Sequence, residues 1–466
     1  MQLQQNRQVI PAMVRRHVED TAFYWSQYDV SEQSFTLSLS DLIRFNGTLQ
    51  AHLDGIAVAG SGAWPFALAA LERWNKPGEA FACTYAAILD GDPARLDLLA
   101  AHIQASPDAL LRGAISALAW APWPAAERAI ARWSAPGAEP VMLVAALRAL
   151  NLINQCLVSD PASTDSDTWL QTPLPELLAS PNAHVRAAAC RLAAQADEDE
   201  QVKQLVKAAL HDGDLAVRAQ AAIAVARLAR DGAYASRFDE QADHELRLRS
   251  VDTLRHCVAS QVALLAGASG WFAKQARRRL ERWVEHLAWM IEPGSGELAT
   301  MLAAMPVRSA LHFVACHGDP AHLPFVVHQM NDPATARYAG WVWQVISGVD
   351  IVGAGLILAQ PAVSADATLD SAPVDADFGL VLPNGAAIAR HRLSLPAGER
   401  CINGQPADHA SMLEIMEGSS QAIRRIAAQH LQSLDPLFIV PVRAPAAIQL
   451  QCADTIDALM DLEHAA

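Results

Sequence analysis

The sequence has no uninterrupted apolar run of about 18 residues, so we expect no membrane-spanning segment. Residues 1–16 carry three arginines but no apolar stretch of the kind that a secretory signal needs. The seven cysteines never form a Cys-x-x-Cys pair, which predicts reduced thiols and a cytoplasmic location. Charged residues are only 18% of the chain and apolar residues are 52%, a composition that excludes wholesale disorder.

Catalytic signatures are also missing, since the chain has no GxxxxGK[ST], no GxGxxG after a strand pattern, no GxSxG and no HExxH. The pair His52 and Asp54 has acid and base groups but no nucleophile beside it, so we interpret it as structural. We therefore expect no enzymatic activity and no cofactor. The net charge of −15, from 35 Lys and Arg against 50 Asp and Glu, opposes binding to phosphate backbones, so no nucleic-acid partner is expected.

Three segments repeat at a nearly constant period. Each contains an apolar residue followed by arginine, at Val185-Arg186, Val217-Arg218 and Leu248-Arg249, spaced by 32 and then 31 residues. After each pair the apolar residues recur with helical periodicity, and a second helical pattern lies between copies. The repeating unit is therefore predicted to be helix, turn, helix, with a short polar break before each copy.

Weaker copies extend this pattern in both directions, at Leu111-Arg112, Ala336-Arg337 and Ile423-Arg424. At Asp92-Pro93 and Asp319-Pro320, we expect the aspartate to cap a helix and the proline to occupy its first turn. Helix pairs of this kind cannot bury their apolar faces alone, so they are predicted to stack on their neighbours.

The repeats resemble HEAT repeats of the short bacterial type, whose second helix begins with Asp, two or three residues, then Val-Arg. The resemblance is best over residues 170–260. It implies an all-α fold, a right-handed superhelical α-solenoid of helical hairpins. The recurring Arg186, Arg218 and Arg249 are interpreted as repeat-stacking residues that bond the preceding turn or the next repeat's aspartate, Asp214 or Asp243. A ligand site is the alternative interpretation.

Composition divides the chain into four expected segments. Residues 1–90 are predicted to form a helical N-terminal cap that covers the open end of the array, and residues 91–350 the repeat array itself. Residues 351–408 read as an acidic linker rich in Pro and Ala, followed by a turn-rich insertion with room for short strands. Residues 409–466 are predicted to hold a last helical repeat and a terminal helix.

The best candidate metal ligands are His312, Cys316, His317, His322 and His328. His312 and Cys316 are four residues apart, a spacing that shares one helix face and occurs in zinc sites. The residues around them are apolar, however, and no second cysteine or His-x3-His completes a set of four ligands. We therefore assign no metal and expect a mixture of core and surface positions.

One dense cationic cluster stands out on this acidic protein, at residues 274–282. Lys274, Arg278 and Arg282 fall on one helical stripe, flanked by Trp271 and Trp283. Arginine and tryptophan are enriched at interface hot spots, which favours a docking surface for an acidic partner. The alternative is a solvated face whose charges pair with Glu281 and Glu285.

A second resemblance concerns the whole chain. Its motifs are Leu42–Phe45, Ala51–Ile56, Ala59-Gly60 and Gly78–Phe81 near the start, and Ala397–Arg400, Asn403-Gly404 and Arg424–Leu431 near the end. These are similar to motifs of a family of proteobacterial proteins built on HEAT-like repeats and often encoded near type VI secretion genes. The resemblance implies a genomic neighbourhood and not a reaction.

Together these patterns favour a non-catalytic protein-binding scaffold. Combined with the family resemblance, they predict an adaptor or chaperone for a type VI secretion effector or spike component. The alternative is a cytoplasmic immunity protein that binds and neutralises a toxin, for which the net charge of −15 would suit a basic, nucleic-acid-cutting target. A third possibility is an enzyme or a metal-dependent protein.

Overall fold

A computed structural model describes residues 9–157, 169–195, 199–230, 240–358, 375–396, 398–435 and 438–465. In these ranges the chain forms 22 α-helices and one two-stranded sheet, so the predicted predominance of helix is confirmed. Within them no helix is, on its own, long and apolar enough to cross a membrane. Leu39–Gly62 and Trp64–Trp74 pass that test only together, as a pair bent by 109°.

The chain divides into two compact units, and neither is continuous in sequence. Unit 1 contains residues 1–32, 38–250 and 439–466, and unit 2 contains residues 33–37 and 251–438. These units group segments that are distant in sequence. The segments expected from composition were 1–90, 91–350, 351–408 and 409–466. Composition carries no information about which distant segments of the chain pack together.

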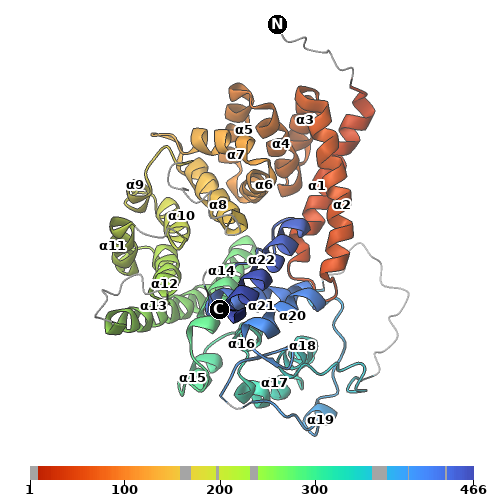
Figure 1. Cartoon of the computed structure of the whole chain (residues 1–466), viewed down its shortest axis with the longest axis vertical. Coiled ribbons are helices and arrows are strands. Elements are labelled where there is room, and N and C mark those ends of the chain that lie inside the picture. The colour runs from red at the N-terminus through yellow and green to blue at the C-terminus, as the bar shows by residue number, and fades with distance from the viewer. Residues whose placement is uncertain are drawn as a thin grey trace. The chain divides into compact units, whose positions relative to one another are not determined.

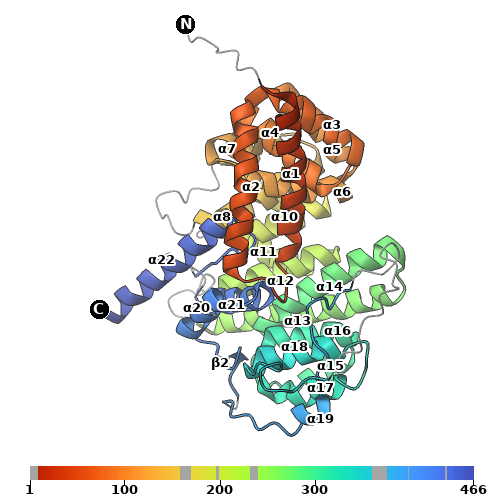
Figure 2. The same cartoon turned by 90° about the vertical axis from the view of Figure 1, so that its right-hand side faces the viewer.

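Unit 1 begins with a long helical hairpin, α1 and α2, which Figure 2 shows side by side. Ser38 and Asp41 start α2 with a reciprocal capping box, in which each side chain accepts a hydrogen bond from the other residue's backbone N–H. The helices of unit 1 are α1 (Pro11–Ser31), α2 (Leu39–Ala59), α3 (Trp64–Trp74), α4 (Pro77–Asp90), α5 (Pro93–Ala105), α6 (Pro107–Trp120), α7 (Trp123–Trp133), α8 (Pro140–Leu157), α9 (Leu174–Leu178), α10 (Ala183–Ala193), α11 (Glu200–Ala208), α12 (Leu215–Arg230) and α22 (Ala446–Ala465).

From α3 to α12 the helices contact one another in a regular pattern (Figure 1). Each even-numbered helix packs on the helix that precedes it. The even-numbered helices also pack on one another in series, α4 on α6, α6 on α8, α8 on α10 and α10 on α12. Backbone approaches closely at the crossing of α4 and α6, where a Cβ added to Gly113 would lie 2.0 Å from the Pro77 carbonyl oxygen. The expected Asp92 cap of α5 is confirmed, because its carboxylate accepts a hydrogen bond from the Ala94 N–H (2.9 Å).

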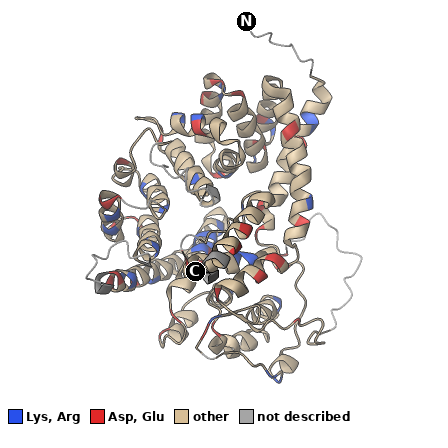
Figure 3. Ribbon diagram, in the orientation of Figure 1, with Lys and Arg blue, Asp and Glu red and all other residues tan. Residues whose placement is uncertain are grey.

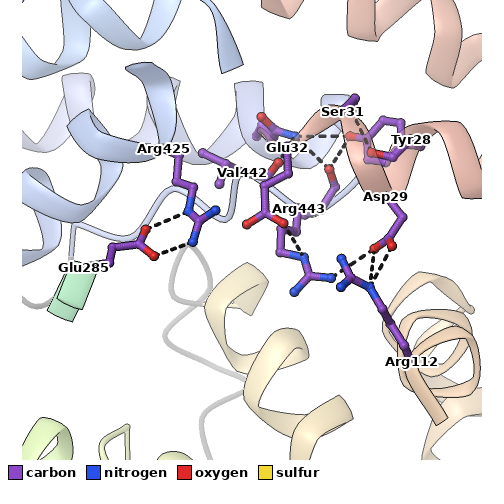
Figure 4. A network of polar contacts seen from close by, with 11 residues as sticks. Tyr28, Asp29, Ser31, Glu32, Arg112, Glu285, Arg425, Val442 and Arg443 are labelled. Carbon is purple, nitrogen blue, oxygen red and sulfur yellow. Dashed lines mark hydrogen bonds and ion pairs between the residues drawn. The ribbon is translucent and has the colours of Figure 1, made fainter. Parts of the chain in front are cut away.

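The residues after 438 return to unit 1 and pack on α1 and α2. The Tyr28 hydroxyl donates to the Ala444 carbonyl (2.6 Å), and the Asn46 side chain accepts from the Ala446 N–H (2.6 Å). Asp29 pairs with Arg443 (3.1 Å) and with Arg112 (2.7 Å), and its side chain is only 13% exposed (Figure 4). This polar network fixes the start of α22, the terminal helix that was expected over about 445–463.

Helix α13 (Glu240–Ala266) runs across the boundary between the units' sequence ranges. The third repeat was expected to have a polar break at Asp243–Glu245 and to open a helix at Leu248-Arg249. Both expectations are wrong, because these residues lie inside the 27-residue α13. Its sequence contains no glycine or proline between 240 and 258, so nothing in it interrupts a helix.

In unit 2, α15 packs on α16, α17 on α18 and α20 on α21, while α14 and α18 both contact α16. A two-residue turn, Asn403 and Gly404, both with positive φ, joins the two antiparallel strands, so the predicted short strands are confirmed. The elements of unit 2, besides part of α13, are α14 (Gly270–Met290), α15 (Leu298–Ala303), α16 (Val307–His317), α17 (Leu323–Gln329), α18 (Ala336–Ser347), α19 (Gly385–Ile388), β1 (Cys401–Ile402), β2 (Gln405–Pro406), α20 (His409–Gly418) and α21 (Gln421–Leu434). Most of the expected acidic linker, residues 359–374, lies outside the described residues.

Candidate functional site

The cationic cluster lies on the first half of α14, where Figure 3 shows Lys and Arg gathered. Lys274 and Arg278 are exposed, whereas Arg282 is half-buried, as expected for a stripe that runs toward the packed end of the helix. No acidic side chain in the described part of the chain forms an ion pair with Lys274 or Arg278. Among the described residues, Lys274 and Arg278 therefore present positive charge that no ion pair compensates, on a protein of net charge −15.

Large apolar side chains are exposed beside this charge. Trp271 is 47% exposed and Phe272 is 71% exposed. The Trp271 and Phe272 rings contact each other edge to face, with centroids 5.0 Å apart. Trp283 was predicted to belong to this surface, but it is only 2% exposed, because the helical period turns it into the core of unit 2. The candidate surface thus comprises Trp271, Phe272, Lys274 and Arg278, and we call it the α14 surface.

The alternative interpretation gave Glu281 and Glu285 as partners for the cations. Glu285 is instead buried and faces Arg425, whose Nε donates to its carboxylate at 2.7 Å (Figure 4). Burial raises the pKa of Glu281, although Arg308 and Arg277 act in the opposite direction. The Glu285 carboxylate is therefore already engaged by a cation on α21.

The three recurring arginines differ in their contacts. Arg186 forms a bidentate pair with Asp212 (2.8 Å for both bonds) and also donates to the Ser180 carbonyl (2.8 Å). Arg218 donates to the Asp212 carbonyl (2.9 Å), which is the predicted bond to the preceding turn. The partner aspartate is Asp212 and not Asp214, which instead caps α12 by accepting from the N–H groups of Ala216 and Val217.

Arg249 does not continue this series. It lies mid-helix in α13 with its side chain 65% exposed, and it pairs at 3.7 Å with Glu245, one turn earlier. Its interpretation as a stacking residue is therefore wrong, since the uninterrupted α13 leaves no preceding turn for it to bond.

The histidine and cysteine cluster separates into two groups. His312 and Cys316 share one face of α16 as predicted, with Nε2 and Sγ 3.9 Å apart, but the other His312 nitrogen, Nδ1, is 3.1 Å from the Tyr338 hydroxyl. Burial lowers the pKa of His312 to about 4 and raises the pKa of the Cys316 thiol. These two residues are core groups, and His328 is exposed on α17.

His317 and His322 lie together with a third residue, Asp319, that the ligand pattern omitted. One ligand atom from each of the three lies within 4.8 Å of the others. Burial lowers the pKa of His317 to about 2, with a further contribution from the positive charge of Arg400. Asp319 was interpreted only as a cap, and it is one, since it accepts from the Ala321 N–H (2.8 Å). The sequence signal that could have placed Asp319 beside the two histidines is an Asp-x-x-His spacing directly after a helix that ends in histidine.

His52 and Asp54 do not contact each other. His52 lies 3.2 Å from His17 between Nδ1 atoms and 3.6 Å from the Asp20 carboxylate, whereas Asp54 accepts from Gln50 (2.9 Å). The six cysteines whose side chains are described are free thiols and are buried.

No family model, no curated protein and no solved structure matches this chain.

Proposed function

We propose that this chain is a non-catalytic α-solenoid scaffold that binds a partner protein. The support is the serial packing of helical hairpins from α3 to α12 in unit 1, together with the helix pairs α15–α16 and α17–α18 within unit 2. Stacked hairpins of this kind form right-handed superhelices that offer extended binding surfaces. The proposal keeps the HEAT-like architecture that the repeats of residues 170–260 resemble.

The partner is proposed to bind the α14 surface through an acidic segment. The observation that carries this is the coincidence of the exposed rings of Trp271 and Phe272 with two cations, Lys274 and Arg278, that form no ion pair in the described ranges. A few hot-spot residues, among which tryptophan, tyrosine and arginine are enriched, supply most of the binding energy at protein interfaces, and complementary charge sets the orientation and the association rate. A patch that combines both on an otherwise acidic molecule selects for an acidic partner.

The resemblance to proteins encoded near type VI secretion genes extends the proposal. The partner is then a secreted effector or spike component, and the chain acts on it as an adaptor or chaperone. A cytoplasmic immunity protein is the alternative, and the net charge of −15 favours it where the target is a basic toxin.

The test is co-purification with the products of adjacent genes, followed by measurement of affinity. We expect the double variant Lys274→Glu, Arg278→Glu to lower affinity at least about tenfold, and Trp271→Ala to do the same. Arg392→Glu, at an exposed arginine elsewhere in unit 2, is the control for charge reversal. Unchanged affinity in both test variants, or retention of nucleic acid in place of a protein, would contradict the proposed surface.

A growth assay separates the two roles. Co-expression with the toxic domain of the partner rescues cells if the chain is an immunity protein. An adaptor binds the same partner and leaves it toxic.

A further inference from the structure

A group of three ligating side chains lies in unit 2, independent of the α14 surface. His317 is the last residue of α16, Gly318 turns the chain with φ +75°, and Asp319 and His322 bracket the short 3-10 turn that follows. The Gly318 carbonyl accepts a hydrogen bond from the Cys401 N–H (2.7 Å), so β1 holds this turn in place. The three side chains therefore approach one another on a fixed segment of backbone.

The His317 imidazole is unsatisfied. The residue is 0% exposed, and neither Nδ1 nor Nε2 forms a hydrogen bond with any described group. The Ile291 carbonyl favours the protonated ring, but the two do not meet ordinary hydrogen-bond geometry. A neutral imidazole has one donor and one acceptor, and leaving a buried polar group unpaired costs the free energy of removing it from water. Such a group requires a ligand or a bound water to account for it.

His322 shares this condition, whereas Asp319 does not. The His322 Nε2 is buried and has no hydrogen-bond partner among the described residues, and its ring meets that of His317 edge to face with centroids 5.6 Å apart. Asp319 is 2% exposed, and its carboxylate accepts from the N–H groups of Ala321 (2.8 Å) and Gly294 (3.0 Å). No cationic side chain in the described ranges forms an ion pair with it. Buried carboxylates are ordinarily paired or bound to a metal.

We propose that His317, Asp319 and His322 bind one divalent first-row transition metal ion of the zinc type. Two imidazole nitrogens and one carboxylate oxygen form a ligand set typical of zinc and its neighbours, whereas magnesium and calcium prefer oxygen ligands alone. Ligand atoms about 2.0–2.1 Å from a tetrahedral zinc ion lie about 3.4 Å apart, so binding draws these atoms together by side-chain rotation. Three protein ligands leave one position for water.

Arg400 carries a positive charge near His317 that disfavours the binding of a metal cation at this site. Its guanidinium donates to the carbonyl oxygens of Ala288 and His317 (3.0 Å each) and Trp289 (3.2 Å), and it also contacts the Ile291 carbonyl. These carbonyls partly offset its charge, and Asp319 supplies the negative charge that the metal requires. His430, which also faces His317, has its Nε2 2.9 Å from the Cys316 carbonyl oxygen, so that nitrogen is engaged elsewhere.

The experiment uses the full chain, stripped of metal with a chelator and then titrated with Zn²⁺ or Co²⁺ alone. We expect one equivalent to bind, the absorption spectrum of Co²⁺ to show nitrogen ligation, and the melting temperature to rise with metal concentration. His317→Ala and His322→Gln should each weaken binding by more than about 100-fold, since removing a ligand exceeds the 10–100-fold effect of its supporting contacts. His328→Ala, at the exposed histidine nearby, should bind as the unaltered chain does.

Because His317 is buried, its replacement can unfold unit 2, so circular dichroism accompanies each titration. His322→Gln, at a partly exposed position, keeps the test valid if His317→Ala does not fold. Absence of stoichiometric binding to the unaltered chain overturns the proposal, and so does binding that His322→Gln leaves unchanged in a folded protein.

Discussion

At the scale of single residues, the same residue type has different roles because its surroundings differ. Arg186 on α10 pairs with Asp212 in the turn before α12 and is 20% exposed, whereas Arg249 lies on the solvent side of a continuous helix and is 65% exposed. The sequence pattern marks both positions identically. Only a turn directly before the arginine separates them, because residues 180–182 form one before Arg186, whereas α13 continues without a break before Arg249.

The two arginines give a matched pair for measurement. Arg186→Ala should lower the free energy of unfolding by about 2 kcal/mol, because hydrogen bonds between charged groups at a partly buried site contribute about 1.5–3 kcal/mol. Arg249→Ala should change it by less than about 0.5 kcal/mol, as exposed ion pairs do. Urea unfolding at pH 7 measures both values. Equal effects would contradict the distinction drawn between the two positions.

The Arg186 effect should depend on pH. The hydrogen bonds from Arg186 hold the pKa of Asp212 below its ordinary value of 3.8 in the folded state. The pair therefore stabilises the protein fully above pH 3.8, and its contribution is lost as the pH falls through the lower folded pKa. The difference between the unaltered chain and Arg186→Ala should shrink below pH 3.8. Unfolding curves at pH 7, 5 and 3.5 check this, with Asp212→Asn as the control that removes the titrating group.

At the scale of helices, a start could be predicted where it depends on neighbours in sequence. Asp92 followed by Pro93 predicts a capped helix, and the structure contains it as α5. The sequence pattern alone could not exclude the helix break expected before Leu248, because aspartate and histidine, the residue types at 243 and 244, occur both in helix caps and within helices. The close crossing of α4 and α6 was not predicted, because a glycine in a helix gives no sign of what lies beside it.

Two helical glycines should respond to the same substitution with opposite signs. Gly113→Ala places a methyl group 2.0 Å from the Pro77 carbonyl oxygen, so it should destabilise unit 1 by about 1–3 kcal/mol despite alanine's better helix propensity. Gly47→Ala on α2 meets nothing within 4 Å and should stabilise by about 0.5–1 kcal/mol. Thermal and urea unfolding measure both. A stabilising Gly113→Ala would show that α4 and α6 can separate freely.

At the scale of the whole chain, the helical class followed from the 3.6-residue periodicity, but the division into units did not. Periodicity reports which face of a helix is apolar and not which distant helix covers it. The contacts of Tyr28 and Asn46 with residues 444–446 connect positions some 400 apart in sequence. The candidate metal site shows the same limit, because Asp319 has a sufficient explanation as a cap until His317 and His322 are placed beside it.

The return of the chain to unit 1 can be tested at its anchor. Asn46→Ala leaves the Ala446 N–H, at the start of α22, without its acceptor and should cost about 1–2 kcal/mol. Hydrogen exchange of the α22 amides should accelerate more than that of α4. Gln50→Ala, on the exposed face of the same helix, should leave α22 protected. Equal protection of α22 in both variants would show that Asn46 does not hold it.

The nested order of the units has a consequence for biosynthesis. A ribosome emits α1 and α2 before residues 251–438, and the segment that packs on these two helices follows only after all of those residues have been made. Until then the nascent hairpin exposes the surface that Ala444 and α22 later cover, and it is vulnerable to chaperone capture or premature association. Translation speed through the middle of the message should therefore influence the yield of native protein more strongly than in a chain whose domains follow one another.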